Sequence, residues 1–107
     1  MLRRQPREAG VFARIATFAG GDVDAMYRVT NERMTSGVDG FPDGVRRAMA
    51  LQTGDRWQII TFFDSREAVD AAEQGFEQMG DEIPESLRGR RVAVETYEVL
   101  FDVEMIR

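Results

Sequence analysis

The stretch VRRAMALQTGDRWQIITFF, residues 45–63, decides the fold that this sequence predicts. Apolar and polar side chains alternate over residues 45–52 and again over residues 56–63, and this period of two is typical of β-strands. The triplet TGD stands between the two runs, and glycine readily adopts the positive φ that a two-residue hairpin loop needs. The stretch therefore predicts two antiparallel strands joined by a tight turn.

A loop at Gly54-Asp55 would set the register of these two strands. Met49 would then lie opposite Ile60, and Arg47 would lie opposite Phe62. Side chains directly opposite each other share a face of the sheet. One face is expected to carry Met49, Leu51, Ile60 and Phe62, and the other Ala48 and Ala50 beside Trp57 and Ile59. Both faces of the hairpin are therefore largely apolar.

The segment before the hairpin predicts a strand, a helix and a loop. Residues 11–18 read as a strand that is apolar on both faces. Asp22 is a suitable N-cap for a helix from Val23 to about Ser36, which has apolar side chains at helical spacing. Residues 37–44 contain three glycines and a proline, so we expect a mobile loop there.

The segment after the hairpin predicts a second helix and a last strand. Asp64 and Glu67 fit a capping box, with Asp64 as the N-cap, and the helix is expected to end near Met79. One short turn is expected to begin at Pro84. Alternation over residues 91–104 predicts a final strand about twice as long as usual.

This β-α-β-β-α-β order predicts a ferredoxin-like fold of the α+β class, with a four-stranded antiparallel sheet and both helices on one face. The other face would meet water, yet no strand has a clean polar side. Burying about 600 Å² of apolar surface per subunit gives a gross stabilisation of ~15 kcal/mol, which the costs of association reduce. We therefore expect a homodimer through the open sheet face, with the last strand reaching the partner's sheet.

The residue types that are missing limit the chemistry. The 107 residues include no His, no Cys and no Lys, and all 14 basic residues are Arg. This excludes Ser-His and Cys-His nucleophiles, Schiff-base lysines, and zinc, iron–sulfur or haem sites that need His or Cys. We expect no cofactor and no metal. A metal would have to be a hard cation on carboxylates, and a general base would be Asp, Glu or a neutral dipole.

Charge and length also limit the partners. A net charge of −5 without a large basic cluster argues against nucleic acid. All apolar runs are far shorter than the ~20 residues that span a bilayer, so no membrane partner is expected. With neither a secretion signal nor cysteine, we expect a cytoplasmic protein. Residues 1–9 are expected to be a flexible N-terminal arm and residues 10–107 a single domain.

The thirteen residues RWQIITFFDSREA, 56–68, resemble a known family. Their strand ending in aromatic residues, polar cap and Glu-Ala helix start are similar to the antibiotic-biosynthesis-monooxygenase-like domains of the dimeric α/β-barrel superfamily. In pattern the resemblance covers residues 10–104, and it implies a dimeric α/β barrel. The family includes cofactor-free oxygenases of aromatic polyketides and haem-degrading enzymes. The haem-degrading branch uses a His in the second helix, and this chain has no His there or elsewhere.

In such a fold the ligand space lies between the sheet and the helices of each subunit. Tyr27 and Asn31 are four residues apart on the first helix and would orient an aromatic ligand if they converge. The alternative, which helical stripes favour, is that Tyr27 belongs to the core and Asn31 to the solvated surface. Trp57 beside Ala48 and Ala50 either borders a cavity or packs against these small residues, and packing is the more frequent arrangement.

Arg14 stands in the middle of the first strand among apolar neighbours. A buried arginine needs a partner, and Glu95 or Glu98 of the last strand is available. Such a pair would be part of a functional site or a salt bridge between subunits, and we favour the salt bridge.

Two functions remain open at this point. The first is a cofactor-independent monooxygenase or related enzyme on an aromatic small molecule that provides its own electrons. Its candidate residues are Tyr27, Asn31, Trp57 and Arg14, and it requires an apolar cavity that contains Trp57 and Tyr27. The second is a non-catalytic small-molecule-binding or structural dimer, for which we expect a filled interior. The fold alone does not choose between them, because one fold hosts many functions.

Overall fold

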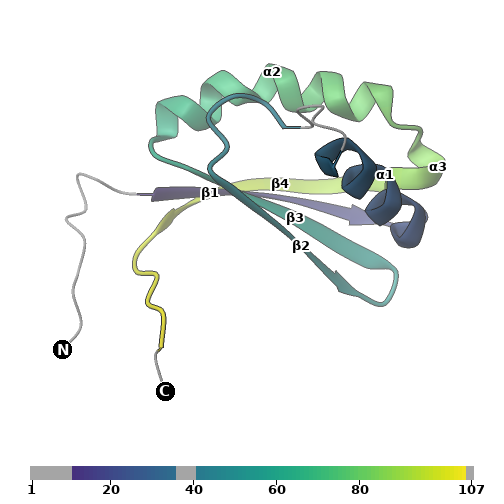
Figure 1. The fold of residues 1–107 in the computed structure, drawn as a ribbon, viewed down its shortest axis with the longest axis horizontal. Coiled ribbons are helices and arrows are strands. Elements are labelled where there is room, and N and C mark those ends of the chain that lie inside the picture. The colour runs from purple at the N-terminus through teal and green to yellow at the C-terminus, as the bar shows by residue number, and fades with distance from the viewer. Residues whose placement is uncertain (1–10, 36–40, 106–107) are drawn as a thin grey trace.

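The computed structural model describes residues 11–35 and 41–105, with the backbone alone for residues 33–35. This part of the chain forms an α+β fold around one four-stranded antiparallel sheet in the order β2-β3-β1-β4 (Figure 1). The predicted α+β class and the four antiparallel strands are therefore confirmed. The predicted N-terminal arm, residues 1–9, and the first half of the predicted loop 37–44 lie outside the described residues.

Four strands and three helices make up the described chain. They are β1 (Val11–Ala19), α1 (Val23–Thr35), β2 (Arg47–Thr53), β3 (Arg56–Phe63), α2 (Arg66–Glu82), α3 (Glu85–Arg88) and β4 (Arg90–Val99). Figure 1 shows α1 and α2 on the same side of the sheet. The short helix α3 follows Pro84, where a turn was predicted.

The β2–β3 hairpin has the predicted register. Met49 pairs with Ile60 and Arg47 with Phe62, on either side of a loop at Gly54-Asp55. Gly54 has a φ of 58°, a conformation that glycine adopts without strain. Because pairing partners share a face, this register decides which side chains of β2 and β3 point toward the helices and which point away.

The N-cap of α2 is Ser65, and the prediction of Asp64 is wrong. The Ser65 hydroxyl accepts a hydrogen bond from the backbone N–H of Ala68 at 3.1 Å. Asp64 instead accepts a hydrogen bond from Arg46 at 2.6 Å, and this bond raises the pKa of the Arg46 guanidinium. Asp64 and Ser65 both have side chains that suit an N-cap. Because Asp64 is bonded to Arg46, Ser65 caps the helix.

The other helix ends show one confirmed prediction and one error. Asp22 caps α1, because its carboxylate accepts a hydrogen bond from the backbone N–H of Ala25 at 3.0 Å. α2 continues past Met79 to Glu82. Nε of Arg88 donates to the carbonyl oxygen of Gly80 at 3.1 Å, which satisfies part of the extended helix end.

The most buried core lies between the sheet and α2. Phe63 is 0 % exposed, and its ring meets the Phe76 ring edge-on with centroids 6.3 Å apart. Val69 and Ala72 complete this cluster from α2. Phe12 and Phe41 pack against it from β1 and from the segment before β2. The core thus holds α2 firmly on the middle of the sheet.

β4 ends at Val99, and the prediction of a strand as far as Glu104 is wrong. Val99 pairs with Val11, the first residue of β1, so the neighbouring strand offers no further hydrogen bonds. Residues 100–105 leave the sheet on the side away from the helices (Figure 1). Their large apolar side chains are exposed, namely Leu100, Phe101 and Met105.

The sheet face opposite the helices is apolar at its centre. By register its apolar side chains include Ala13, Ile15, Met49, Leu51, Ile60, Phe62, Tyr97 and Val99, and the polar side chains Thr17, Arg47, Gln58 and Glu95 share it; we call this surface the open face. Half of the Tyr97 side chain is exposed, and its hydroxyl donates to Oε2 of Glu95 at 2.6 Å. This hydrogen bond, with the charge of the carboxylate, raises the pKa of the Tyr97 phenol. Figure 1 shows no described element over this face.

Candidate functional site

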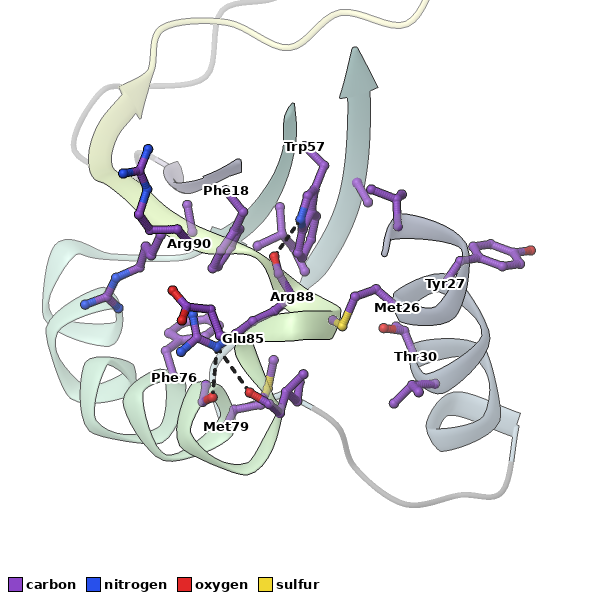
Figure 2. A pocket seen from close by; sticks show the side chains of 18 of the residues that line it. Phe18, Met26, Tyr27, Thr30, Trp57, Phe76, Met79, Glu85, Arg88 and Arg90 are labelled. Carbon is purple, nitrogen blue, oxygen red and sulfur yellow. Dashed lines mark hydrogen bonds between the residues drawn. The ribbon is translucent and has the colours of Figure 1, made fainter. Parts of the chain in front are cut away.

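A cavity of about 700 Å³ lies between the sheet and the three helices (Figure 2). This volume is within the range of small-molecule sites. β1, β2 and β3 form its floor, α1 and α2 its sides, and α3 with the start of β4 one end. The large apolar side chains of its wall include Phe18, Met26, Trp57, Ile59, Phe76 and Met79. A filled interior, as expected for a purely structural dimer, is not what this region shows.

Small residues on the floor leave this room. Ala16 of β1 and Ala50 of β2 both border the cavity, and the register places Ala50 opposite Ile59 and Ala16 opposite the same residue from the other side. Ile59 therefore lies between two alanines in the row of side chains that faces the helices. Such a shallow row lowers the floor beneath α1 and α2.

Trp57 is both packed and part of the cavity wall. Its ring stacks on the Phe18 ring, with centroids 4.6 Å apart and planes 16° from parallel. Its indole N–H donates to the carbonyl oxygen of Arg88 at 2.9 Å. Phe18 is the pairing partner of Trp57, so the β1–β3 register brings the two rings together. Trp57 therefore packs against a neighbour and also borders the cavity, so the two alternatives are compatible. The stack on Phe18 and the hydrogen bond to Arg88 together hold the orientation of its ring.

Arg14 borders the cavity as well, and its partner is neither Glu95 nor Glu98. Nε of Arg14 donates to Oε1 of Glu73 at 2.6 Å, and Nη2 to Oε2 at 3.3 Å. The guanidinium also lies over the Phe76 ring, 4.0 Å from its centroid. Both Glu73 and Phe76 belong to α2, so the pair joins the sheet to a helix within one chain. The favoured interpretation of a salt bridge between subunits is therefore wrong for this pair.

Tyr27 and Asn31 do not converge on the cavity. Tyr27 contributes to the rim, but its side chain is 71 % exposed and points away from the interior (Figure 2). Asn31 is exposed on α1 and is not part of the cavity wall. From the same helix, Met26 and Thr30 face the interior instead. The structure thus unites Trp57 and Arg14 and leaves Tyr27 and Asn31 outside.

The end of the cavity at α3 carries most of its charge. Arg88, Arg90 and Arg91 border it together with Asp81 and Glu85. The Arg88 guanidinium donates hydrogen bonds to the carbonyl oxygens of Gly80, Ile83 and Gly89, so it stabilises the backbone around α3. Within residues 11–35 and 41–105, no three acidic side chains gather in a way that would hold a metal ion.

Glu73 and Phe18 are the site residues that sequence reasoning missed. Glu73 follows Val69 by four residues and precedes Phe76 by three, so it lies on the apolar stripe of α2. A charged residue on that stripe together with a charged residue inside β1 was a signal for the pair. Phe18 had no such signal, because the register between β1 and β3 depends on tertiary structure.

Comparison with known proteins gives no family for this chain. No protein-family model matches the sequence, and no curated protein matches it. No helix in the described part of the chain is long and apolar enough to cross a membrane. Function must therefore be inferred from the cavity itself.

Proposed function

We propose that this protein binds an aromatic small molecule in the cavity between its sheet and helices. The observation that carries the proposal is the cavity of about 700 Å³ with the Trp57–Phe18 stack in its wall. Aromatic and methionine side chains suit a flat apolar ligand, since rings stack and thioethers adapt to their shape. Most of the charged side chains gather at the α3 end of the wall, so apolar contact with the rest of the wall would supply most of the affinity.

As an enzyme, the protein would be a cofactor-independent monooxygenase of an activated aromatic. In this reaction a ring methylene gives up two hydrogens and takes one atom of O₂ as a carbonyl, while the other oxygen atom leaves as water. The substrate supplies all four electrons, so neither a metal nor a flavin is needed. A carboxylate would accept the first proton. Glu85 of α3 is a carboxylate in the cavity wall and is the candidate for this role (Figure 2).

The second candidate function is binding without catalysis. The acidic residues in the cavity wall, Glu77, Asp81 and Glu85, are all exposed to solvent. A general base is usually tuned by burial or by charged neighbours, so exposure of these carboxylates favours a carrier or sensor role. Turnover of a reduced aromatic separates this candidate from the first.

We expect 2-naphthol to bind in the cavity and to quench the fluorescence of Trp57, the single tryptophan of the chain. Ala50→Phe should weaken binding at least about tenfold, because the new ring occupies the floor beneath the helices. Met49→Phe is the matched control, since Met49 is the neighbour of Ala50 on the opposite face of β2. Fluorescence titration and calorimetry measure both variants.

Equal weakening by Ala50→Phe and Met49→Phe, or no binding of 2-naphthol to the unaltered protein, would contradict the proposal. For catalysis, the probe is anthrone, whose ring methylene has the required chemistry. Oxygen uptake equal to the quinone formed, and lost in Ala50→Phe, would support the monooxygenase. Binding of anthrone without oxygen uptake would support the carrier instead.

We further propose that the sheet is ferredoxin-like and that two copies pair through their open faces into a dimeric α/β barrel. The apolar centre of the open face and the exposed apolar side chains of residues 100–105 support this assembly. Residues 100–105 lie on the same side of the sheet as the open face (Figure 1). They would contact the partner's sheet, in the role first expected of a longer strand.

A negative charge at the centre of the open face should dissociate this dimer. We expect the unaltered protein to have twice the 12.1 kDa mass of the chain at micromolar concentration, and Ile60→Glu to have the mass of one chain. Gln74→Glu is the control, because it adds the same charge to the exposed side of α2. Sedimentation equilibrium gives the masses. A single-chain mass for the unaltered protein would refute the dimer.

A further inference from the structure

The helix α1 packs against the rest of the protein less closely than α2 does. Among its described side chains, those of residues 23–32, Met26 is the single buried one, with 8 % of its surface exposed. Three side chains of α2 are buried and belong to the hydrophobic core, namely Val69, Ala72 and Phe76. None of the described side chains of α1 is part of that core. Because elements with few buried apolar contacts open most easily, α1 is expected to be the less stable of the two helices.

The cavity is the reason for this difference, because it separates α1 from the sheet. Val23, Met26 and Thr30 of α1 border the cavity, and Figure 2 shows Met26 and Thr30 directed toward the interior. The floor of the cavity carries the small side chains of Ala16 and Ala50. The inner side of α1 therefore faces a space that a ligand can occupy. A bound ligand would supply the apolar contacts that the floor does not give to α1.

The first residue before α1 is firmly attached to the rest of the protein. The backbone N–H of Asp22 donates to the carbonyl oxygen of Leu87 in α3 at 2.8 Å, and the carboxylate of Asp22 caps α1. Gly21 lies so close to α3 that an added Cβ would stand 2.6 Å from the same carbonyl oxygen. The backbone N–H of Gly20 donates to the carbonyl oxygen of Asp55 at 2.8 Å. The start of α1 is thus a fixed point about which the rest of the helix can swing.

We propose that α1 is a lid, which swings about its start at Asp22 to admit the ligand and then closes over it. This inference rests on the proposed binding function and describes how the site is entered and covered. Opening removes one described side chain, Met26, from a buried position and leaves the core of β1, β3 and α2 intact. Closing over a ligand places Met26 and Thr30 against it. Ligand binding and closure of α1 are therefore coupled.

Amide hydrogen exchange in the unaltered protein, followed residue by residue by NMR, tests the lid directly. In the free protein the amides of α1 should exchange about tenfold or more faster than those of α2, after correction for intrinsic rates. Saturating 2-naphthol should slow exchange in α1 about tenfold or more and leave α2 within about twofold, because the ligand binds the closed state. Equal protection of the two helices in the free protein would overturn the lid.

Thr30→Leu should close the lid without a ligand. The larger apolar side chain would extend from α1 into the cavity and give the helix a contact with the floor, so exchange in α1 should slow about fivefold or more. Asn31→Leu is the matched control, because Asn31 is exposed on α1 and outside the cavity wall, and Asn and Thr have similar helix propensities. Equal slowing in both variants would show that helix propensity alone acts, which would contradict the lid.

The lid and the binding function fail in different ways. Binding of 2-naphthol that leaves exchange in α1 unchanged would overturn the lid and leave the binding function standing. Failure of 2-naphthol to bind to the unaltered protein would overturn both proposals. Fast exchange in free α1, slowed by 2-naphthol and by Thr30→Leu but not by Asn31→Leu, is the result that supports the lid.

Discussion

Replacing Gly89 by alanine is expected to lower the free energy of unfolding by about 3 kcal/mol or more. Gly89 joins α3 to β4 with a φ of 81° and a ψ of −177°, a region that residues with a Cβ hardly enter. A Cβ at this position would also stand 2.6 Å from the carbonyl oxygen of Ala19. Backbone would have to move on one side or the other, and β1 and β4 meet here.

Gly20→Ala provides the matched control for this prediction. Gly20 also has a positive φ, 76°, but an added Cβ meets nothing within 4 Å. It should therefore lose only about 1–2 kcal/mol, the cost of the left-handed conformation. Urea unfolding followed by circular dichroism measures both variants. Losses of equal size would show that the contact with Ala19 contributes nothing.

The consequence of Gly89→Ala should extend to the cavity. Arg88 immediately precedes Gly89 and accepts the indole hydrogen bond of Trp57 through its carbonyl oxygen. A shift of this junction would move the group that orients the Trp57 ring. Binding of 2-naphthol should therefore weaken in Gly89→Ala, even at low temperature, where the protein is folded.

Phe63→Ala is expected to destabilise the protein by about 3–5 kcal/mol. Phe63 is fully buried and contacts Val69, Ala72 and Phe76, so its removal leaves a cavity beneath α2. A domain of this size has a total stability of roughly 5–15 kcal/mol, so the loss is a large fraction of it. The loss should not vary with protein concentration, because these contacts lie within one chain. Chemical denaturation at two concentrations measures it.

Phe62→Ala is the matched control, since Phe62 is the next residue of β3 and lies on the open face. If the proposed dimer forms, this variant should unfold more easily at low protein concentration than at high concentration. Mass action links the stability of a dimer to its concentration. A loss for Phe62→Ala that is small and independent of concentration would argue for an uncovered open face. A small loss for Phe63→Ala would contradict the core described here.

Much of the fold follows from local sequence patterns. The hairpin register was predictable because a two-residue loop at Gly54-Asp55 determines which residues of the two strands pair. The helix stripe of Val69, Ala72 and Phe76 was predictable because side chains three and four apart share a face. The N-cap of α2 was not, because Asp64 and Ser65 both suit it and Arg46, a distant residue, decides between them.

The end of β4 shows a different limit. Alternation continues in the sequence beyond Val99, since residues 100–105 keep a strand-like pattern. A strand exists only where a neighbouring strand offers hydrogen bonds, and β1 begins at Val11, opposite Val99. The pattern therefore identified the apolar side chains correctly but predicted a strand that is too long.

By itself the sequence determined which chemistry is excluded, the order of the elements and the apolar character of both sheet faces. A chain without His, Cys or Lys keeps those limits in any fold. Only the tertiary structure decided that Trp57 stacks on Phe18, that Arg14 pairs with Glu73, and that Tyr27 turns away from the interior. The reason is physical, because periodicity reports which face of its own element a residue occupies. It does not report which residue of another element stands opposite, and a binding site is made of such pairs.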